Sequence, residues 1–289
     1  MRIPESELII NSDGTVFHLH IRPEQLADNI ILVGDPGRVS LMKPFLDSLE
    51  CEGQSREFVW ATGEYSGKRV TILSTGIGCD NIDIVMTELD ALANIDFKTR
   101  ELRAEHRRLS IIRIGTCGAI QPEIPIGAYI FSHIAIGFDG LLNWYEGRDS
   151  IALLDFEKAF KKHMDWDKHL PDPYFVRACA DMVDKFKDVT YKGMTISAPG
   201  FYGPQGRSVR LKLSMHDMLD DIESFEYEGY KITNFEMESS AIFGLAAKLG
   251  HDAGSVCCAV AHRHHKDANT NYQPFMEKLV QIVLERLTW

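Results

Sequence analysis

The stretch "SIIRIGTCG", residues 110–118, decides the fold class, because it is a β-branched apolar run that ends in a glycine turn. Similar runs recur along the chain, and such runs are typical of buried strands. They are "NIILVGDPG" (29–37), "RVTILSTGIG" (69–78), "AYIFSHIAIG" (128–137), "GMTISAPG" (193–200) and "GSVCCAVAH" (254–262). Helix-length segments with apolar residues three and four positions apart follow or precede several of them, at 80–93, 241–250 and 274–287.

This alternation of strands and helices predicts an α/β fold with a largely parallel sheet. The chain carries no internal repeat, low-complexity tract or Pro/Ser-rich linker, so we expect residues 1–289 to form a single domain. In open α/β sheets, ligands bind outside the carboxyl ends of the strands. We therefore expect the chemistry of this protein to lie in the glycine turns.

Composition narrows the possible partners. Of 289 residues, 45% are apolar and 25% are charged, which is the profile of a soluble globular protein. The formal net charge of −11 opposes binding to nucleic acid or to an anionic membrane, since both need a positive surface. The N-terminus "MRIPESELII" lacks the features of a signal peptide, and the six cysteines form no CxxC pair. We expect a cytoplasmic protein with reduced thiols.

Two arginines near glycine turns suggest an anion site. Arg38 follows the turn of "GDPGRV", where backbone N–H groups and one guanidinium could hold an anion, although a plain tight turn is the alternative. Arg113 lies inside the apolar run, and a buried charge needs either an acidic partner or an anionic ligand. Thr116 could add a hydroxyl. Guanidinium groups present paired donors to phosphate oxygens, so phosphate fits this set.

Competing motifs fail on spacing. The run "STGIGCDN" has Gly76 and Gly78 of a G-x-G-x-x-G pattern but Asn81 in the third position, and no P-loop motif occurs. The cluster "AHRHHKD", residues 261–267, has adjacent histidines beside basic residues rather than the regular spacing of a zinc site. We interpret it as a polar loop.

The run "TNFEMESSAIFGLAAKLG", residues 233–250, predicts an apolar helix with two carboxylates, Glu236 and Glu238, at its entrance. Acids in a first helical turn complement the helix dipole, and Thr233-Asn234 could supply the cap. That purely structural interpretation competes with a role in binding. The charged segment 96–109 predicts a solvated helical extension with Leu102 and Leu109 on one face.

Taken together, these motifs resemble the nucleoside phosphorylase family, and within it the uridine phosphorylase branch. The resemblance covers nearly the whole chain, because six short motifs recur in the family's order: "GDPGRV", "SREF", "STGIG", "RIGTCGAI", "FYGPQGR" and "NFEMES". It implies a three-layer α/β/α fold around a mixed, twisted sheet. It also implies transfer of a ribosyl group from a nucleobase to inorganic phosphate.

The resemblance implies roles for particular residues. The phosphate pocket matches Gly34, Arg38, Arg113 and Thr116, with Arg56 donated across a subunit interface. The ribose pocket matches Met237, Glu238 and the less defined Glu236, with His18 of a neighbouring subunit reaching the 5′-hydroxyl. The base pocket matches Phe201, Gln205, Arg207 and Arg263. The resemblance further implies no cofactor besides the co-substrate phosphate, and a homo-oligomer with a dimer as minimal active unit and a hexamer as a possibility.

Some positions depart from the family pattern. Cys117 replaces a hydroxyl residue beside the phosphate threonine, and His262 replaces an asparagine on the base side. A cation-binding glutamate of bacterial relatives matches Glu57, but Asn81 stands where a serine is needed, so we assign no metal. Purine nucleoside phosphorylase, a nucleosidase that uses water, and a non-catalytic nucleoside-binding protein remain alternatives.

Overall fold

The computed structural model describes residues 2–263, 265 and 267–287. Its longer strands are β1 (Asn29–Val33), β2 (Ser48–Ser55), β3 (Phe58–Tyr65), β4 (Lys68–Ser74), β7 (Ser110–Ala119), β8 (Tyr129–Gly137), β9 (Tyr174–Arg177), β10 (Tyr191–Ser197), β12 (Tyr230–Glu236) and β13 (Asp252–His262). Two-residue strands are β5 (Ile95–Asp96), β6 (Glu101–Leu102), β11 (Glu226–Tyr227) and β14 (Asp267–Ala268). The α-helices are α1 (Pro36–Met42), α2 (Cys79–Asn94), α3 (Leu154–His163), α4 (Ala180–Phe186), α5 (Met218–Ser224), α6 (Ser239–Leu249) and α7 (Gln273–Leu287).

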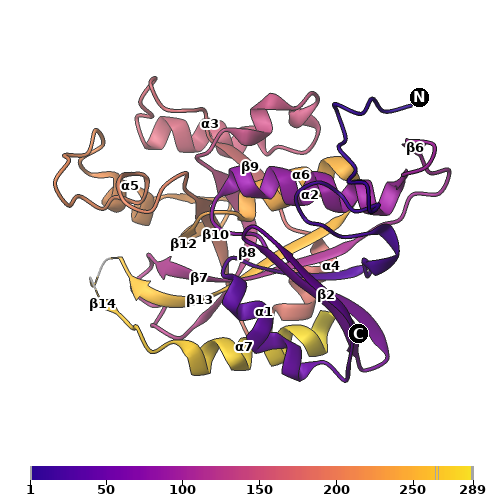
Figure 1. Ribbon diagram of the computed structural model, residues 1–289. Coiled ribbons are helices and arrows are strands. Elements are labelled where there is room, and N and C mark those ends of the chain that lie inside the picture. The colour runs from indigo at the N-terminus through magenta and orange to yellow at the C-terminus, as the bar shows by residue number, and fades with distance from the viewer. Residues whose placement is uncertain (1, 264, 266, 288–289) are drawn as a thin grey trace.

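One mixed sheet organises the described chain, in the strand order β11-β12-β10-β8-β13-β7-β1-β4-β3-β2. The pairings β4–β1–β7–β13 and β8–β10–β12 are parallel, whereas β8 runs antiparallel to β13 and β3 runs antiparallel to both β2 and β4. All the strand runs read from the sequence lie in this sheet. The predicted mixed α/β fold is confirmed (Figure 1).

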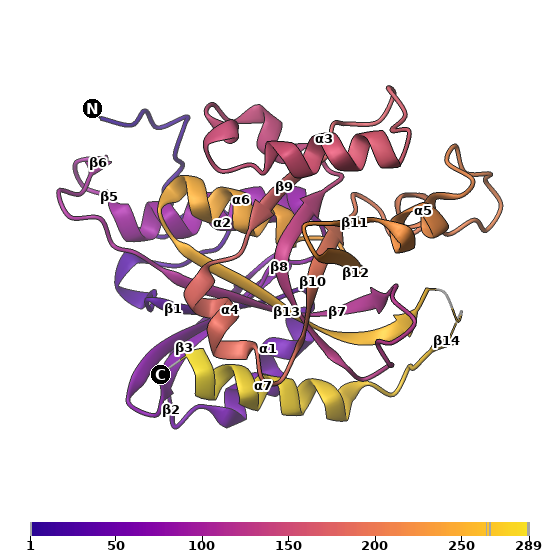
Figure 2. The same cartoon turned by 180° about the vertical axis from the view of Figure 1, so that it is seen from behind.

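The sheet also closes on itself. Strand β12 pairs with β10 along one edge and antiparallel with the end of β7 along the other, where Asn234 faces Ala119 and Phe235 faces Gly118. The pairings β12–β10–β8–β13–β7–β12 therefore form a ring (Figure 2). This closure sets the last residues of β12 beside the carboxyl end of β7.

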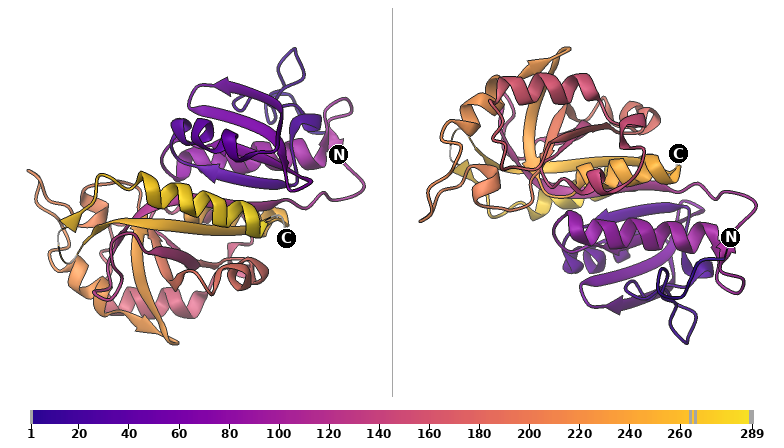
Figure 3. Two further views of the ribbon diagram at one scale, coloured as in Figure 1. Left: turned by 90° about the horizontal axis from the view of Figure 1, so that it is seen from below. Right: turned by 90° about the horizontal axis from the view of Figure 1, so that it is seen from above.

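Successive residues of β1 face opposite layers of core. Ile30 and Leu32 pack in a cluster with α2 and α6, whereas Ile31 and Val33 pack in a cluster with α1, α4 and α7. Figure 1 shows α2 and α6 on one side of the sheet and α1 and α7 on the other, and Figure 3 shows α7 lying along its face. This is the expected three-layer arrangement. Among the described residues, no helix is both long and apolar enough to cross a membrane.

The prediction of a helix from residue 233 onward is wrong in its first part. Residues 230–236 form β12, and α6 begins only at Ser239. Thr233 and Asn234 are therefore buried strand residues rather than a cap, and the Thr233 hydroxyl donates to the Met194 carbonyl at 3.1 Å. Nothing in the sequence indicated that a strand ends at Glu236, because short segments with buried apolar residues fit a strand and a helix equally well.

The helical extension predicted for 96–109 is also wrong. Asp96 accepts hydrogen bonds from the backbone N–H groups of Lys98 and Thr99, at 2.8 and 3.0 Å, and Arg100 has a left-handed φ of 59°. These features make a tight turn between β5 and β6. Leu102 is exposed and Leu109 is fully buried, so the two do not share a face.

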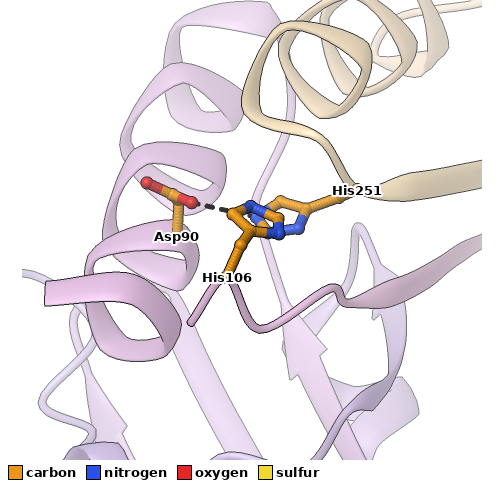
Figure 4. Close-up of side chains that lie close together, drawn as sticks. All are labelled: Asp90, His106 and His251. Carbon is orange, nitrogen blue, oxygen red and sulfur yellow. Dashed lines mark hydrogen bonds and ion pairs between the residues drawn. The ribbon is translucent and has the colours of Figure 1, made fainter. Parts of the chain in front are cut away.

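Three side chains tie this segment to α2 and to the start of β13. His251 Nε2 lies 3.1 Å from Asp90 Oδ1, its Nδ1 accepts from the Leu109 backbone N–H at 3.2 Å, and its ring stacks on His106 (Figure 4). A histidine that binds a metal usually donates its second ring N–H to an acceptor. Because Nδ1 of His251 accepts instead, Nε2 carries the proton. We interpret the cluster as a structural hydrogen-bond network rather than a metal site.

Replacing His251 by Ala should therefore destabilise the fold by about 1–3 kcal/mol, because the buried Leu109 N–H loses its acceptor. His106→Ala is the matched control, since that ring is exposed and its removal should cost less than about 1 kcal/mol. Urea unfolding followed by circular dichroism measures both. Equal losses of stability in the two variants would contradict the structural role of the His251 hydrogen bonds.

Candidate active site

A cavity of about 670 Å³ opens at the carboxyl ends of the central strands. It is lined by the β1–α1 turn, the β2–β3 hairpin, the β4–α2 turn, the ends of β7, β12 and β13, and the loop after β10. Ten of the thirteen residues that the family resemblance assigned to the phosphate, ribose and base pockets line it: Gly34, Arg38, Arg113, Thr116, Phe201, Gln205, Arg207, Glu236, Met237 and Glu238. Segments far apart in the sequence thus meet at one site.

A buried ionic cluster forms the floor of this cavity. The Arg113 guanidinium donates through Nη2 to the Glu238 carboxylate, and its Nη1 lies 3.3 Å from Glu236 Oε2. All three residues are almost fully buried, at 5%, 4% and 3% exposure for Arg113, Glu236 and Glu238. The acidic partner that a buried arginine requires is therefore present within the chain.

Burial and charge act against each other in this cluster. Burial tends to lower the pKa of Arg113, but the charges of Glu238 and Glu236 outweigh it and hold that pKa above its ordinary value. Burial also raises the pKa of Glu238, although Arg113 opposes the rise. Gly115 gives the guanidinium its space, because a Cβ at this position would come within 1.9 Å of Arg113 Nη1.

The two carboxylates have different surroundings. Glu236 accepts from the backbone N–H groups of Glu238 and Ser239 and from the Ser197 hydroxyl, so the protein itself satisfies its oxygens. Glu238 accepts at Oε1 from the Gly78 backbone N–H at 2.8 Å, and its other oxygen contacts Arg113. Glu236 thus fixes the segment that carries Glu238, which agrees with the structural role at the helix entrance that was considered for it from the sequence.

The opposite wall carries the turn between β1 and α1. Asp35 caps α1 by accepting from the Gly37 N–H at 2.8 Å, which sets Gly34 and Arg38 at the cavity. Arg38 has no hydrogen-bond or ion-pair partner among the residues that the structure describes, and Thr116 lines the same wall. An unpaired guanidinium, a hydroxyl and a helix N-terminus in one cavity suit a small anion.

The loop after β10 forms the remaining wall. Arg207 Nη1 donates to Gln205 Oε1 and to the Phe201 carbonyl, both at 2.6 Å, and the guanidinium lies 3.8 Å from the centre of the Phe201 ring. Gln205 is 3% exposed, and Arg207 fixes which way its amide points. Arg263 does not line this cavity but donates to the Gln205 carbonyl at 2.8 Å.

These two arginines repel each other. Burial and then the charge of Arg263 lower the pKa of Arg207 to about 10, and burial lowers the pKa of Arg263. Within the described chain neither forms an ion pair with a carboxylate. This end of the cavity is therefore positively charged.

Besides Arg263, two predicted site residues, His18 and Arg56, do not line the cavity. His18 instead pairs with Glu88 of α2, at 2.6 Å between Nδ1 and Oε1. Arg56 is exposed at the β2–β3 hairpin with a left-handed φ of 54°. Of the predicted polar loop 261–267, His262 is buried at the end of β13, and residues 264 and 266 lie outside the described residues.

Comparison with known sequences places these features in a family. A sequence model of the phosphorylase superfamily matches residues 28–287, which is most of the chain. The chain belongs to the phosphorylase superfamily.

Relatives of this superfamily member differ in the bases named for them. Uridine phosphorylase of Thermococcus kodakarensis is 28% identical over 254 residues, covering 87% of this chain and 79% of the relative. A DeoD-type purine nucleoside phosphorylase of Colwellia psychrerythraea is 25% identical, covering 92% and 98%. The solved Trypanosoma brucei nucleoside phosphorylase, described as having uridine phosphorylase activity, is 29% identical with a TM-score of 0.85, covering 97% of this chain and 99% of that one.

Several groups that position the cavity residues were not recognised from the sequence. The Gly78 N–H that binds Glu238 lies in a turn considered mainly for dinucleotide binding, and its contact spans 160 positions. Ser197 and Cys79 act on the same segment, because the Cys79 thiol donates to the Met237 carbonyl at 3.2 Å. The glycines of "STGIG" were the available signal, since glycine allows close backbone approach.

Replacing Arg113 by Met should destabilise this superfamily member by about 3–5 kcal/mol near pH 8, because two buried carboxylates lose their counter-charge. The pKa of Glu238 in the folded variant should then rise further above its ordinary value, because Arg113 no longer opposes the effect of burial. The penalty exists while Glu238 is ionised and should shrink as the pH falls toward 5.5 and this carboxylate becomes protonated. Urea unfolding at the two pH values measures the effect.

Two variants serve as controls. The triple variant Arg113→Met, Glu236→Gln, Glu238→Gln removes all three charges and should recover much of the lost stability. Lys43→Met breaks an exposed ion pair with Glu52 and should cost less than about 1 kcal/mol at either pH. A loss in Arg113→Met that does not depend on pH would show that shape, not charge, is responsible.

Proposed function

We propose that this protein is a uridine phosphorylase, which reversibly converts uridine and phosphate to uracil and ribose 1-phosphate in nucleoside metabolism. One observation carries the proposal: Arg38 and Arg113, from separate turns, line the same cavity as the buried Glu238. A single cavity thus offers cations for a dianion and an acceptor for a sugar diol. The named activities of the relatives agree with it.

At the phosphate end, Gly34, Arg38, Arg113 and Thr116 bind the dianion. The unpaired guanidinium of Arg38 and the turn at the start of α1 support this role. Each charge-assisted hydrogen bond to phosphate contributes about 1.5–3 kcal/mol. Arg56 completes the pocket from a neighbouring subunit, which is consistent with its exposed position outside the cavity of its own chain.

At the sugar, Glu238 accepts hydrogen bonds from the 2′- and 3′-hydroxyls, and Met237 packs on the ribose face. An ionised carboxylate is only an acceptor, which suits two adjacent hydroxyl donors. Glu236 belongs to the ribose site mainly by holding Glu238 in place, since its own oxygens are already occupied. His18 of the neighbouring subunit meets the 5′-hydroxyl.

At the base, Gln205 and Arg207 bind the carbonyl edge of uracil, Phe201 stacks on the ring, and Arg263 lies behind Gln205. Arg207 already donates to Gln205 Oε1, which leaves the amide N–H₂ of Gln205 to donate to a base carbonyl. Uracil gains negative charge as it departs. Two arginines without carboxylate partners favour that charge.

In the proposed reaction, phosphate attacks C1′ as the glycosidic bond loosens through an oxocarbenium-like transition state. No covalent intermediate with the enzyme is required. The arginines at the phosphate end orient the attacking dianion, whose charge also stabilises the cationic sugar. Catalysis therefore comes mainly from proximity and preorganised charge, each able to contribute several kcal/mol.

Purine nucleoside phosphorylase is the second candidate, because DeoD-type purine enzymes are similar to this chain over more than nine-tenths of its length. It would share the phosphate and ribose ends. A nucleosidase would have no use for an unpaired Arg38. A non-catalytic nucleoside-binding protein would bind uridine without turnover.

The wider properties of the protein belong to the same proposal. We propose a single domain over residues 1–289, a homo-oligomer whose minimal active unit is a dimer and which could extend to a hexamer, and a cytoplasmic location. Phosphate and the nucleoside are the only small-molecule partners, and no cofactor or metal takes part. The sheet that spans most of the described chain supports the single domain.

The decisive experiment follows uridine by ultraviolet absorbance with and without phosphate. Uracil release should require phosphate, and its rate should saturate with phosphate concentration. A panel of uridine, thymidine and inosine then separates the pyrimidine from the purine enzyme. Base release without phosphate would remove the phosphorylase assignment, and preference for inosine would replace it with the purine one.

Replacing Glu238 by Ala should lower kcat/KM for uridine more than for 2′-deoxyuridine, because only the riboside loses the bond to a 2′-hydroxyl. One charge-assisted hydrogen bond predicts an extra loss of roughly ten- to hundredfold. The ratio of the two substrates cancels any general damage to the site. Equal losses on both sugars would contradict the diol assignment.

A further inference from the structure

The N-terminal segment 16–21, "VFHLHI", is bound to the middle of α2 by one carboxylate. Glu88, which is 7% exposed, accepts from the backbone N–H of His18 at 3.1 Å and from that of Leu19 at 2.9 Å. The same carboxylate lies 2.6 Å from Nδ1 of the His18 ring. A turn at His20, with a left-handed φ of 51°, returns the chain toward the core.

The contact at Nδ1 decides the proton positions on His18. An ionised carboxylate can only accept, so Nδ1 must carry the hydrogen. In the neutral ring, Nε2 is then left with a lone pair, able to accept a hydrogen bond from a hydroxyl. The edge-to-face contact with Phe17, at 4.8 Å between ring centres, further limits rotation of the imidazole.

The His18 ring is partly exposed at the surface. The His18 side chain is 29% exposed, whereas Val16, Leu19 and Ile21 around it are fully buried. His18 does not line the cavity of its own chain. An oriented acceptor at the surface is available to a second copy of the chain, where the proposed function puts the 5′-hydroxyl of the nucleoside.

We propose that Glu88 is a positioning residue: by holding the Nδ1 hydrogen of His18 it keeps Nε2 as an acceptor for the 5′-hydroxyl of a nucleoside bound in a neighbouring subunit. The inference rests on the proposed function. The neighbouring subunit then contributes to substrate specificity, because nucleosides without a 5′-hydroxyl cannot form the hydrogen bond to the oriented ring. Glu88 itself does not touch the substrate.

Glu88→Gln is the informative variant. The glutamine oxygen can still accept from the backbone N–H groups, but the amide can also donate to Nδ1, so the ring is no longer restricted to one proton position. We expect kcat/KM for uridine to fall roughly three- to tenfold, the value of one neutral hydrogen bond, and kcat/KM for 5′-deoxyuridine to stay near the wild-type value. A merely structural role would lower both equally, and that outcome would overturn the proposal.

A double-mutant cycle tests whether the effect passes through His18. His18→Ala should lower the uridine to 5′-deoxyuridine ratio at least as much as Glu88→Gln, and the combined variant should match His18→Ala alone. Additive losses would show that Glu88 acts independently of the ring. The same assay separates failure of the proposed function from failure of this inference. If the wild-type protein released no uracil in the presence of phosphate, the proposed function itself would be wrong.

A measurement on the unmodified protein covers the case in which Glu88→Gln fails to fold. Nitrogen-15 chemical shifts of the His18 ring, assigned by comparison with His18→Ala, report which nitrogen carries the hydrogen. In the neutral ring of full-length wild-type protein, the proposal requires hydrogen on Nδ1 and a lone pair on Nε2. Hydrogen on Nε2 would overturn it regardless of activity.

Discussion

The buried cluster of Arg113, Glu236 and Glu238 is the constraint on which the site depends. Charges removed from water are tolerated only when they are paired and hydrogen-bonded, and here each member is held by the others or by backbone N–H groups. The strand β7, the end of β12 and the β4–α2 turn are therefore fixed relative to one another. Because these segments form walls of the cavity, the cluster also sets the shape of the cavity.

The topology explains why the cluster can form. In an open sheet of this strand order the end of β12 would lie far from β7, but here β12 pairs antiparallel with β7 at Phe235 and Gly118. That pairing closes the ring and delivers the following residues to Arg113. Gly115 then leaves room for the guanidinium to fold back over its own strand. Glycine is required here because of this close approach, not because of a positive φ.

The sequence predicted six strands of the sheet, because apolar runs ending in glycine turns are local signals, but it missed β2, β3, β9 and β12. At the cavity, Phe201, Gln205 and Arg207 came from the family resemblance rather than from such local signals. The sequence could not predict where residues 233–250 change from strand to helix, since a buried strand and a buried helix share the same apolar pattern. The turn made by Asp96 and Arg100 was hidden by a charge pattern typical of helices. Long-range contacts, such as Gly78 to Glu238, have no local signature.

The like charges of Arg207 and Arg263 have a consequence for the timing of catalysis. Two partly buried guanidiniums without a carboxylate partner are held together at an electrostatic cost in the resting protein. A neutral nucleoside leaves that repulsion largely in place when it binds. In the proposed reaction the repulsion between the two guanidinium groups decreases only as the glycosidic bond breaks and the base becomes anionic. The repulsion therefore lowers the activation barrier and does not strengthen binding of the nucleoside.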